Sequence, residues 1–333
     1  MSFAILGVAG YVAPRHLEAI RAAGHRVVAA MDPHDSVGVL DRYFPNARYF
    51  RDLAGFERHL DALARRGERD RVDFVSICSP NDLHESHVRV ALSRGAHAIC
   101  EKPVAIEPTS LDRLADLERE AGRRVYTVLQ LRHHSTLVEL RRRIQGTAAG
   151  RHRHQVVMTY VTPRGRWYHA SWKGDESRSG GLGTNIGIHL FDLLLWLFGP
   201  TRRVTLHARS RTRMAGSLEL ERADVCWLLS IDARDLPPSH RAASHRTGPP
   251  RPFRSLRIDG EAIPFEAPPE LHTDVYRAIL DGNGLGLEAA RPAVELVHTL
   301  RHAPLSPDRG SRRSHEVAAT AAHSEGANEL LPA

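Results

Sequence analysis

The sequence predicts an α/β protein with an N-terminal doubly wound parallel sheet, followed by an α+β domain with an open, mostly antiparallel sheet. Over the first 130 residues, apolar strand-like runs alternate with helix-period segments, which is the pattern of βαβ units with right-handed crossovers. Beyond residue 131, strand-like stretches group together with helices to one side, as in antiparallel sheets. The 333 residues allow two domains. We expect them at 1–130 and 131–303, with a poorly ordered tail at 304–333.

Each expected element follows from its local apolar pattern. Strands of the first domain are expected at 3–8, 26–31, 74–78, 97–100 and 124–129, and its helices at 14–23, 53–65, 82–94 and 110–121. The second domain should open with a helix at 134–144 and continue with strands at 155–161, 203–208, 223–231, 255–258 and 262–265. Three further helices are expected at 185–198, 271–280 and 287–302. Residues 235–254, rich in Pro, Ser, Arg and His, are expected to form a loop.

The composition favours a reduced, cytoplasmic protein. Three widely spaced cysteines form no CxxC pair, which argues against a disulfide framework or a thiolate metal site. The 21 histidines lack HExxH or Cys/His spacing, so no metal is expected. We see no signal peptide and no apolar run near the ~20 residues of a membrane span. The net charge of +7 is spread along the chain and favours a phosphate-bearing substrate over nucleic acid.

Lysine is almost absent from this chain. Of 46 basic residues, only Lys102 and Lys173 are lysines, so 46 − 2 = 44 are arginines. Drift from lysine to arginine codons in a GC-rich genome would explain this, and the two remaining lysines then mark places where Arg does not serve. Lysine is a compact ammonium whose pKa shifts readily, whereas Arg is a fork that stays protonated. The alternative is that both lysines are leftovers of the drift.

The first strand runs into a glycine turn that suggests a dinucleotide site. Gly7 and Gly10 would let backbone N–H groups approach a pyrophosphate at the start of the next helix. The spacing is not a clean GxGxxG, because Ala9 replaces the middle glycine. A tight turn without a ligand is the alternative. Asp32, which ends the second strand, would accept hydrogen bonds from ribose hydroxyls and repel a 2′-phosphate, which favours NAD over NADP.

Two further strand ends carry polar residues. Ser79-Pro80-Asn81, with His84 shortly after, follows the third apolar strand, and Glu101-Lys102-Pro103 follows the fourth. Ligands collect at the carboxyl ends of strands in doubly wound folds, so these residues should flank the nicotinamide. Turns after strands often contain Asn and Pro without any ligand, which is the alternative.

A glycine-rich segment at 180–183 leads into a helix that carries Asn185, His189 and Asp192. Asn185 and His189 are four residues apart and share one helix face. Asp192 could orient the imidazole, and imidazole is the usual proton shuttle near neutral pH. A single histidine on such a helix is more often structural, but the glycine-rich lead-in and Lys102 favour a functional role.

Taken together, these residues resemble the glucose–fructose oxidoreductase/inositol dehydrogenase (Gfo/Idh/MocA) family, most specifically through Glu101-Lys102-Pro103 and the glycine-rich segment up to His189. Within the family, the chain looks most like the UDP-N-acetylglucosaminuronate 3-dehydrogenases. The shared stretches are 10–16, 35–38, 129–134, 171–175 and 184–187. The common family pattern has Asp where this chain has Asn185, a departure typical of that subgroup that removes a carboxylate from the proton-transfer geometry.

The resemblance implies a Rossmann domain that binds NAD, and a second domain that binds substrate and mediates oligomerisation, with a tetramer favoured. It implies oxidation of the C3 hydroxyl of UDP-GlcNAcA in bacterial surface-polysaccharide (lipopolysaccharide) synthesis, with Lys102 and His189 as catalytic residues. The implied cofactor residues are Gly7, Ala9, Gly10, Tyr11, Val12, Asp32, Ser79, Asn81, His84, Glu101, Lys102 and Gln130. The implied substrate residues are Arg132, Arg164, Trp167, Tyr168, Lys173, Thr184, Asn185 and His189.

Three other functions stay open at this point. The chain could be another sugar or inositol dehydrogenase of the same family, or a non-catalytic NAD-bound regulator. Intact Lys102 and His189 argue against the regulator, because a decayed site tends to lose such residues. A basic nucleic-acid binder is the weakest option, since no nucleic-acid motif is present. Neither a nucleic-acid nor a membrane partner is expected.

Overall fold

The computed structural model describes residues 1–68, 70–146, 152–241, 251–264, 268 and 270–307. The chain divides into two compact units. The first is Met1–His134 with Ala267–Glu295, and the second is Ser135–Glu266 with Leu296–Ala333. The first unit therefore takes in a late segment that the sequence analysis assigned to the second domain. Residues 308–333, most of the expected tail, lie outside the described residues.

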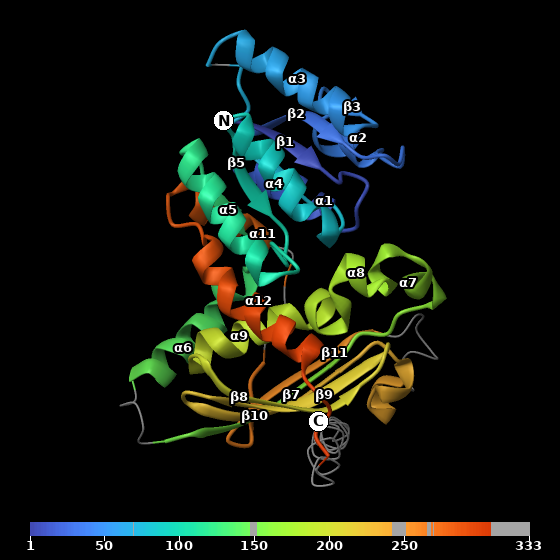
Figure 1. Ribbon diagram of the computed structural model, residues 1–333, viewed down its shortest axis with the longest axis vertical. Helices are drawn as coiled ribbons and strands as arrows, with labels where there is room; N and C mark the ends of the chain where they lie inside the picture. The colour runs from blue at the N-terminus through green and yellow to red at the C-terminus, as the bar shows by residue number, and fades with distance from the viewer. Residues whose placement is uncertain (69, 147–151, 242–250, 265–267, 269, 308–333) are drawn as a thin grey trace, which may run out of the picture. The chain divides into compact units, whose positions relative to one another are not determined.

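The first unit is built on a six-stranded parallel sheet in the order β3-β2-β1-β4-β5-β6 (Figure 1). This order is that of a doubly wound Rossmann sheet, so the predicted fold class is confirmed for this unit. The strand order reverses between β1 and β4, where such sheets bind their ligands. The strands are β1 Ser2–Leu6, β2 Arg26–Met31, β3 Arg48–Phe50, β4 Phe74–Ile77, β5 His97–Cys100 and β6 Val125–Thr127.

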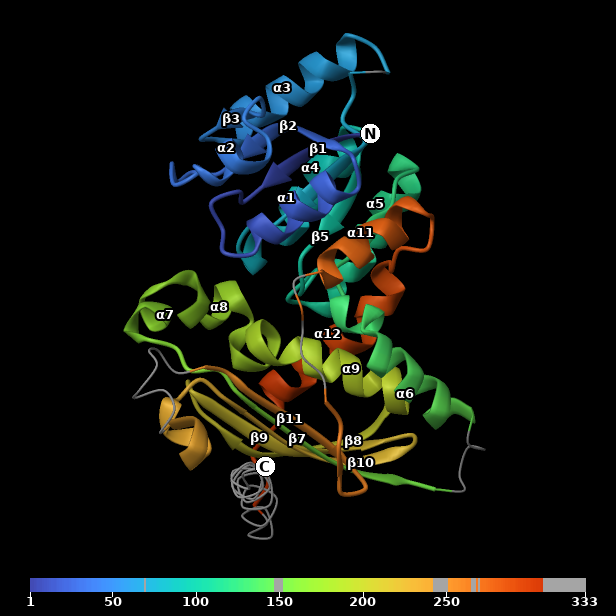
Figure 2. The same ribbon diagram turned by 180° about the vertical axis from the view of Figure 1, so that it is seen from behind.

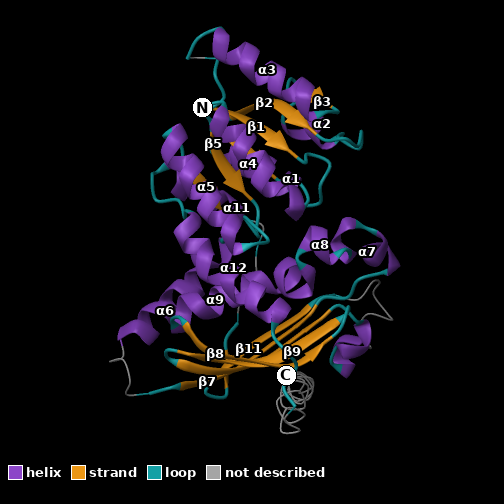
Figure 3. Ribbon diagram, viewed as in Figure 1, coloured by secondary structure: helices purple, strands orange, loops and turns teal. Residues whose placement is uncertain are grey.

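Helices cover both faces of this sheet, as the purple ribbons around its orange strands show (Figure 3). The α-helices are α1 Ala13–Ala22, α2 Val39–Tyr43, α3 Leu53–Arg65, α4 His84–Ser93, α5 Pro108–Ala121 and, from the late segment, α11 Leu271–Leu280. Short 3-10 turns are η1 Asn81–Leu83 and η2 Gln130–His133. Helix α11 packs beside α1 (Figure 2). Its Tyr276 and Ile279 are fully or nearly fully buried in the same core as Phe3 and Ile5 of β1, which explains why the late segment belongs to this unit.

The second unit holds a six-stranded sheet in the order β12-β11-β7-β10-β9-β8. Only the central pair β7 and β10 is parallel, so the predicted mostly antiparallel sheet is confirmed. The strands are β7 His154–Val161, β8 Thr201–Arg209, β9 Arg213–Leu220, β10 Ala223–Ser230, β11 Phe253–Ile258 and β12 Glu261–Ala262. Strand β9 was missed by the sequence analysis. Its Gly216 weakens the strand pattern, yet a Cβ there would lie 2.4 Å from the Thr205 carbonyl oxygen.

One long helical stretch crosses a face of the second sheet. It comprises α8 Glu176–Ser179, the π-helical turn η4 Gly183–Gly187 and α9 Ile188–Phe198. A Cβ on Gly187 would lie 2.4 Å from Leu229 of β10, and the rings of Phe191 and Trp227 meet at 5.1 Å. By length and hydropathy Glu176–Phe198 could span a membrane, a stretch that the sequence analysis overlooked. Since 83% of its apolar window is buried inside the protein, it is a core helix.

The remaining elements complete the second unit and its link to the first. They are α6 Ser135–Gly146, α7 Arg166–Ala170, η3 Trp172–Gly174, η5 Ala233–Asp235 and α12 Leu287–His302, whose residues divide between the two units. The expected loop at 235–254 is only partly described: residues 238–241 are helical, and 242–250 lie outside the described residues.

Candidate active site

The turn after β1 approaches the end of β4 as closely as backbone atoms allow. Gly7 adopts φ +83°, and a Cβ on it would lie 2.6 Å from the carbonyl carbon of Cys78 and from the backbone nitrogen of Ser79. A Cβ on Gly10 would lie 3.0 Å from the Gly7 carbonyl oxygen. Gly7 therefore requires glycine, whereas a side chain at Gly10 would be tight, and the two bring the turn to the point where the strand order reverses.

Helix α1 begins directly after this turn without a side-chain cap. Its N-cap residue Val12 makes no side-chain capping bond, and a proline occupies the first turn. The N–H groups of Ala13 and Arg15 donate to backbone carbonyls, and Pro14 has no N–H, so the helix dipole rather than free N–H donors of the first turn favours an anion here. Tyr11 is 88% exposed, so its ring is available to a bound molecule. The turn and the helix together fit the pyrophosphate of a dinucleotide.

Asp32 is fixed in place by the glycine turn. One carboxylate oxygen accepts a hydrogen bond from the Ala9 N–H at 3.0 Å, and the other accepts from the His34 N–H at 2.9 Å. The residue is 6% exposed. Its carboxylate is thus held at the end of β2, where an acidic side chain selects a ribose with free hydroxyls.

The residues after β4 form a buried turn. Ser79 and Asn81 are 7% and 5% exposed. His84 is not open to a cofactor, because it is 1% exposed and both its ring nitrogens face carbonyl oxygens, Nδ1 that of Pro103 at 2.6 Å and Nε2 that of Ser79 at 2.9 Å. His87, which sequence reasoning missed, hydrogen-bonds the Ser79 hydroxyl at 2.9 Å.

Glu101 and Lys102 differ in their surroundings. Glu101, expected near the cofactor, is 6% exposed, and its carboxylate points to the buried rings of His16 at 2.9 Å and His272 at 3.3 Å. Lys102 is half-buried, and the peptide bond to Pro103 is cis. No local pattern marks His16 or His272, since they lie 85 and 171 residues from Glu101.

Two expected residues lie on η2, after β6. Gln130 is 8% exposed, and the guanidinium of Arg132 donates to the Ala289 carbonyl at 2.8 Å. Arg132 therefore ties η2 to the late segment of the first unit. Its expected role toward substrate stays a prediction.

In the second unit, the residues expected to bind substrate gather around the π-helical turn. Asn185 is buried, and its amide donates to the Tyr168 hydroxyl at 2.8 Å. Burial raises the pKa of Tyr168, against the hydrogen bond from Asn185 and the charge of Arg164. The buried Thr184 lies in the same turn. Such π turns occur often at functional sites, and sequence alone does not distinguish them from α-helix.

His189 lies one turn further, on α9, and is the partly exposed residue in a run of buried neighbours. Asp192 is 2% exposed. The expected orientation of the His189 ring by Asp192 stays a prediction. Its partial exposure leaves the His189 ring accessible from outside the helix core.

A cavity of about 280 Å³ opens within the second unit beside α8 and the start of the π turn, and neither His189 nor any other residue of α9 lines it. Tyr168 and Lys173 line it, whereas Arg164 and Trp167 do not. The Lys173 ammonium lies 4.3 Å from the ring centroid of Trp172. Three arginines also line the cavity and make it cationic. The sequence analysis did not single them out, because arginine is so common in this chain. They are Arg209, Arg211 and Arg301.

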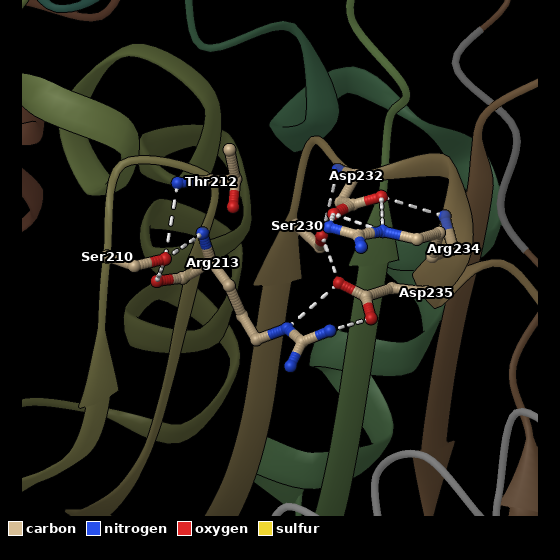
Figure 4. A network of polar contacts seen from close by, with 7 residues as sticks. All are labelled: Ser210, Thr212, Arg213, Ser230, Asp232, Arg234 and Asp235. Atoms are coloured by element: carbon tan, nitrogen blue, oxygen red, sulfur yellow. Dashed lines mark hydrogen bonds and ion pairs between the residues drawn. The ribbon is translucent and has the colours of Figure 1, made fainter.

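The wall of this cavity formed by the β8–β9 turn is braced by polar contacts (Figure 4). Arg213 pairs with Asp235, which also accepts from the Ser230 hydroxyl at 2.6 Å. The Ser210 hydroxyl accepts from the Arg213 N–H at 3.1 Å. On the cavity side, Arg209 donates to the last carbonyls of α12, at 2.6 Å for Arg301. The remaining members drawn are Thr212, Asp232 and Arg234.

The glycine turn, the fixed Asp32 and the reversed strand order define a dinucleotide-binding protein of the Rossmann class. Comparison with known proteins identifies its family. Residues 1–129 match the model of the oxidoreductase family with an NAD-binding Rossmann fold, and residues 137–228 match that family's C-terminal domain. The chain belongs to the GFO/IDH/MocA oxidoreductase family, as its motifs predicted.

Solved structures similar to this chain include the WlbA (WbpB) dehydrogenase from Thermus thermophilus. In complex with NAD and UDP-GlcNAcA it is 48% identical, with a TM-score of 0.86, and the match covers 92% of this chain and 97% of that one. A second structure, with NAD and α-ketoglutarate, has a TM-score of 0.87 and covers 93% and 98%. Among curated relatives, the D-glucoside 3-dehydrogenase of Escherichia coli is 29% identical over 141 residues, 41% of this chain and only 39% of its own length.

Proposed function

We propose that this protein oxidises the C3 hydroxyl of UDP-GlcNAcA to the 3-keto sugar with NAD⁺. The observation that carries the proposal is the 48% identity, over nearly the whole of both chains, to a dehydrogenase crystallised with NAD and UDP-GlcNAcA. In the cell this step would belong to the cytoplasmic synthesis of a diacetamido-uronic acid for surface polysaccharide. The enzyme would act as a homo-oligomer, with a tetramer favoured.

The first unit fits the cofactor. Gly7 and Gly10 allow the close approach, and the positive end of the α1 dipole would face the pyrophosphate. The Asp32 carboxylate receives the adenosine ribose. Bound NAD⁺ supplies the acceptor for the hydride from C3. Further expected cofactor contacts are Ala9, Tyr11, Val12, Ser79, Asn81, Lys102 and Gln130.

Oxidation of an alcohol releases a proton as the hydride leaves, so the protein must supply a base. His189, partly exposed on a buried helix, is our first choice. Lys102 would hydrogen-bond the same oxygen and favour its alkoxide character. Asn185 cannot take a proton, and its amide is engaged by Tyr168, so it orients the site without adding charge.

The substrate is a dianionic diphosphate with an added carboxylate, and the second unit offers cations for it. Lys173 lines the cavity together with Arg209, Arg211 and Arg301. Trp167, 56% exposed, offers a face for uracil or the sugar. The other proposed contacts are Arg132, Arg164, Tyr168 and Thr184.

The same similarity bears on how NADH is reoxidised. The Thermus thermophilus dehydrogenase has also been crystallised with NAD and α-ketoglutarate. A 2-oxo acid can accept the hydride and a proton to give the 2-hydroxy acid. We therefore propose that a 2-oxo acid regenerates NAD⁺ in this enzyme too. Single-turnover NADH formed from the sugar should decay on addition of α-ketoglutarate and persist without it.

The deciding experiment is incubation of the purified protein with NAD⁺, α-ketoglutarate and UDP-GlcNAcA, followed by mass spectrometry. We expect a sugar product two mass units lighter. UDP-GlcNAc, which lacks the carboxylate, and free N-acetylglucosamine, which lacks the nucleotide, serve as matched controls and should turn over at least tenfold more slowly. Comparable turnover of either control, or of inositol, would favour another dehydrogenase of the family. NAD binding with no turnover of any sugar would favour a regulator.

A further inference from the structure

Both neighbours of Lys102 are held by buried histidines from three separate elements. His16 lies on α1, His84 begins α4, and His272 lies on α11. Their exposed fractions are 0, 1 and 2%. Each of the three rings makes a contact that leads to the Glu101–Pro103 turn, although His272 Nδ1 is buried without a hydrogen-bond partner.

The contacts before Lys102 centre on the Glu101 carboxylate. One oxygen lies 2.9 Å from His16 Nε2 and 3.3 Å from His272 Nε2, and the other accepts from the Lys102 N–H at 3.3 Å. Burial raises the pKa of Glu101, but the hydrogen bonds from the two rings outweigh it and hold the pKa well below its usual range. Burial lowers the pKa of His16. The ionised carboxylate therefore accepts from the N–H of the neutral His16 ring, and His272 Nε2 lies on the same oxygen.

This assignment continues into the core. With its proton on Nε2, His16 accepts at Nδ1 from the Tyr276 hydroxyl, 2.8 Å away. The Tyr276 hydroxyl lies 2.6 Å from the Ser76 hydroxyl on β4. A buried carboxylate costs several kcal/mol unless it is hydrogen-bonded, and this chain of donors, which reaches Glu101 through His16, compensates for that cost.

The contact after Lys102 comes from His84. Its Nδ1 lies 2.6 Å from the Pro103 carbonyl oxygen, and its Nε2 lies 2.9 Å from the Ser79 carbonyl oxygen. Burial lowers the pKa of His84, although both carbonyls raise it. The neutral ring carries one N–H and donates it through Nδ1, at the shorter distance, so it links the turn after β5 to the start of α4, where His84 lies.

We propose that His16, His84 and His272 are positioning residues that clamp the Glu101–Pro103 turn and so fix the Lys102 backbone for catalysis. A lysine side chain has four rotatable bonds, so its ammonium is placed only if its Cα is fixed and the supporting residues are locked. The catalytic part rests on the proposed function. The clamp itself is a property of the first unit and can be tested without substrate.

The substrate-free test uses the scarcity of lysine. Reductive ¹³C-methylation labels only Lys102, Lys173 and the N-terminus, and the Lys102→Met variant assigns the Lys102 NMR signal. In His16→Leu and His272→Leu we expect the Lys102 signal to shift or split while the Lys173 signal stays unchanged. His16→Gln and His272→Gln, whose amides can still donate to Glu101, should restore most of the wild-type signal.

The kinetic test separates positioning from general loss of structure. In the leucine variants, kcat should fall at least tenfold, while the KM for the sugar and the Kd for NAD change less than about threefold. His97→Leu is the matched control, because His97 lies at the opposite end of β5, bonded to the Arg124 N–H at 2.9 Å. It should lower the melting temperature at most, with kcat unchanged.

Tyr276→Phe keeps the ring and removes one hydroxyl, so it tests the clamp even if the leucine variants fail to fold. We expect kcat to fall about two- to fivefold and the Lys102 signal to shift in the same direction. An unchanged Lys102 signal in folded variants, or an unchanged kcat, would overturn the clamp. The ligand atoms of His16, Glu101 and His272 lie within 4.8 Å of one another, so stoichiometric bound metal that is lost in His16→Gln would also overturn the clamp. A lack of turnover with UDP-GlcNAcA refutes only the proposed function, because the NMR result still decides the clamp.

Discussion

At the scale of single residues, arginine supplies most of the positive charge, and lysine is kept at two positions. Arg fills nearly every basic position, so the two lysines stand out against 44 arginines. Lys102 follows a carboxylate fixed by two buried rings, and Lys173 lies over Trp172 at the wall of a cavity. The flexible lysine ammonium suits a position where a proton must be transferred, whereas the planar arginine guanidinium suits the binding of a fixed anion.

Lys102→Arg should therefore fail almost as badly as Lys102→Ala, although it keeps the charge. Arg is longer and forked, and it does not release a proton near neutral pH. We expect kcat to fall by about 10²–10⁴, the usual contribution of a positioned acid–base group. The measurement is single-turnover NADH formation in a cycle with His189→Asn, where the two losses should be non-additive. A near-wild-type rate in Lys102→Arg would mean that Lys102 is only a point charge.

Asp32 should set the choice between NAD and NADP. Its carboxylate is pinned by the N–H groups of Ala9 and His34, so it cannot swing away from a 2′-phosphate. We expect NAD to bind at least about tenfold more tightly than NADP, and Asp32→Ala to narrow that gap. Titration of both cofactors by fluorescence tests this, and equal affinities in the wild type would contradict it.

Sequence reasoning found those site residues that a local pattern of neighbouring residues marks. Gly7, Asp32 and Lys102 each stand at the end of an apolar run, where a doubly wound sheet binds its ligand. It could not find His16 or His272, because their partner lies 85 and 171 residues away. It assigned His84 to the cofactor, whereas the ring is buried against two carbonyls.

At the scale of elements, periodicity located most helices and strands but not their finer geometry. The bounds of β2, β5, α3, α11 and α12 match the expected ranges. The sequence analysis expected ordinary helix from residue 185 and a glycine-rich lead-in before it, whereas Gly183–Gly187 forms a π turn, because α and π turns share the same apolar pattern. The short β3 and α2 were missed because each offers too few residues for a period.

Two glycines of the π turn make a matched pair for testing how tightly it packs. A Cβ at Gly187 would lie 2.4 Å from Leu229, whereas one at Gly183 would meet only Met214, at 3.6 Å. We expect Gly187→Ala to destabilise the fold by about 1–3 kcal/mol through overpacking, and Gly183→Ala to be neutral or better. Chemical denaturation of both variants checks this, and equal stabilities would show that Leu229 can move aside at no cost.

At the scale of the whole molecule, topology rather than local pattern decided which segments belong together. The helices of Ala267–Glu295 were expected, but not that this segment belongs to the first unit. An apolar helix face shows that the helix packs against something, but not which element it packs against. The buried Tyr276 ring settles it by bonding His16 and Ser76, 260 and 200 residues away. The mostly antiparallel character of the second sheet was predicted. Its parallel pair of strands, β7 with β10, was not, because no local pattern marks the crossover that connects them.

The buried histidines should make the whole fold sensitive to acid. Burial lowers the pKa of His16 and His84, and lowers that of His87 from 6.5 to about 4. Between those values the unfolded chain binds protons that the folded protein excludes, so the free energy of unfolding rises with pH across the window from about 4 to 6.5. At about 1.4 kcal/mol per pKa unit, His87 alone would contribute about 3 kcal/mol of lost stability at the acid end.

Urea denaturation at intervals from pH 4.5 to 8 would test this, with stability expected to fall steadily below pH 6.5 and to level off above pH 7. His87→Asn keeps an acceptor for the Ser79 hydroxyl, which lies 2.9 Å from His87 Nδ1, but carries no titrating group. It should therefore flatten the slope, while His302→Asn, at an exposed position, should leave it unchanged. A wild-type stability that stays constant between pH 5 and 7 would show that the buried rings take up protons without opening the fold.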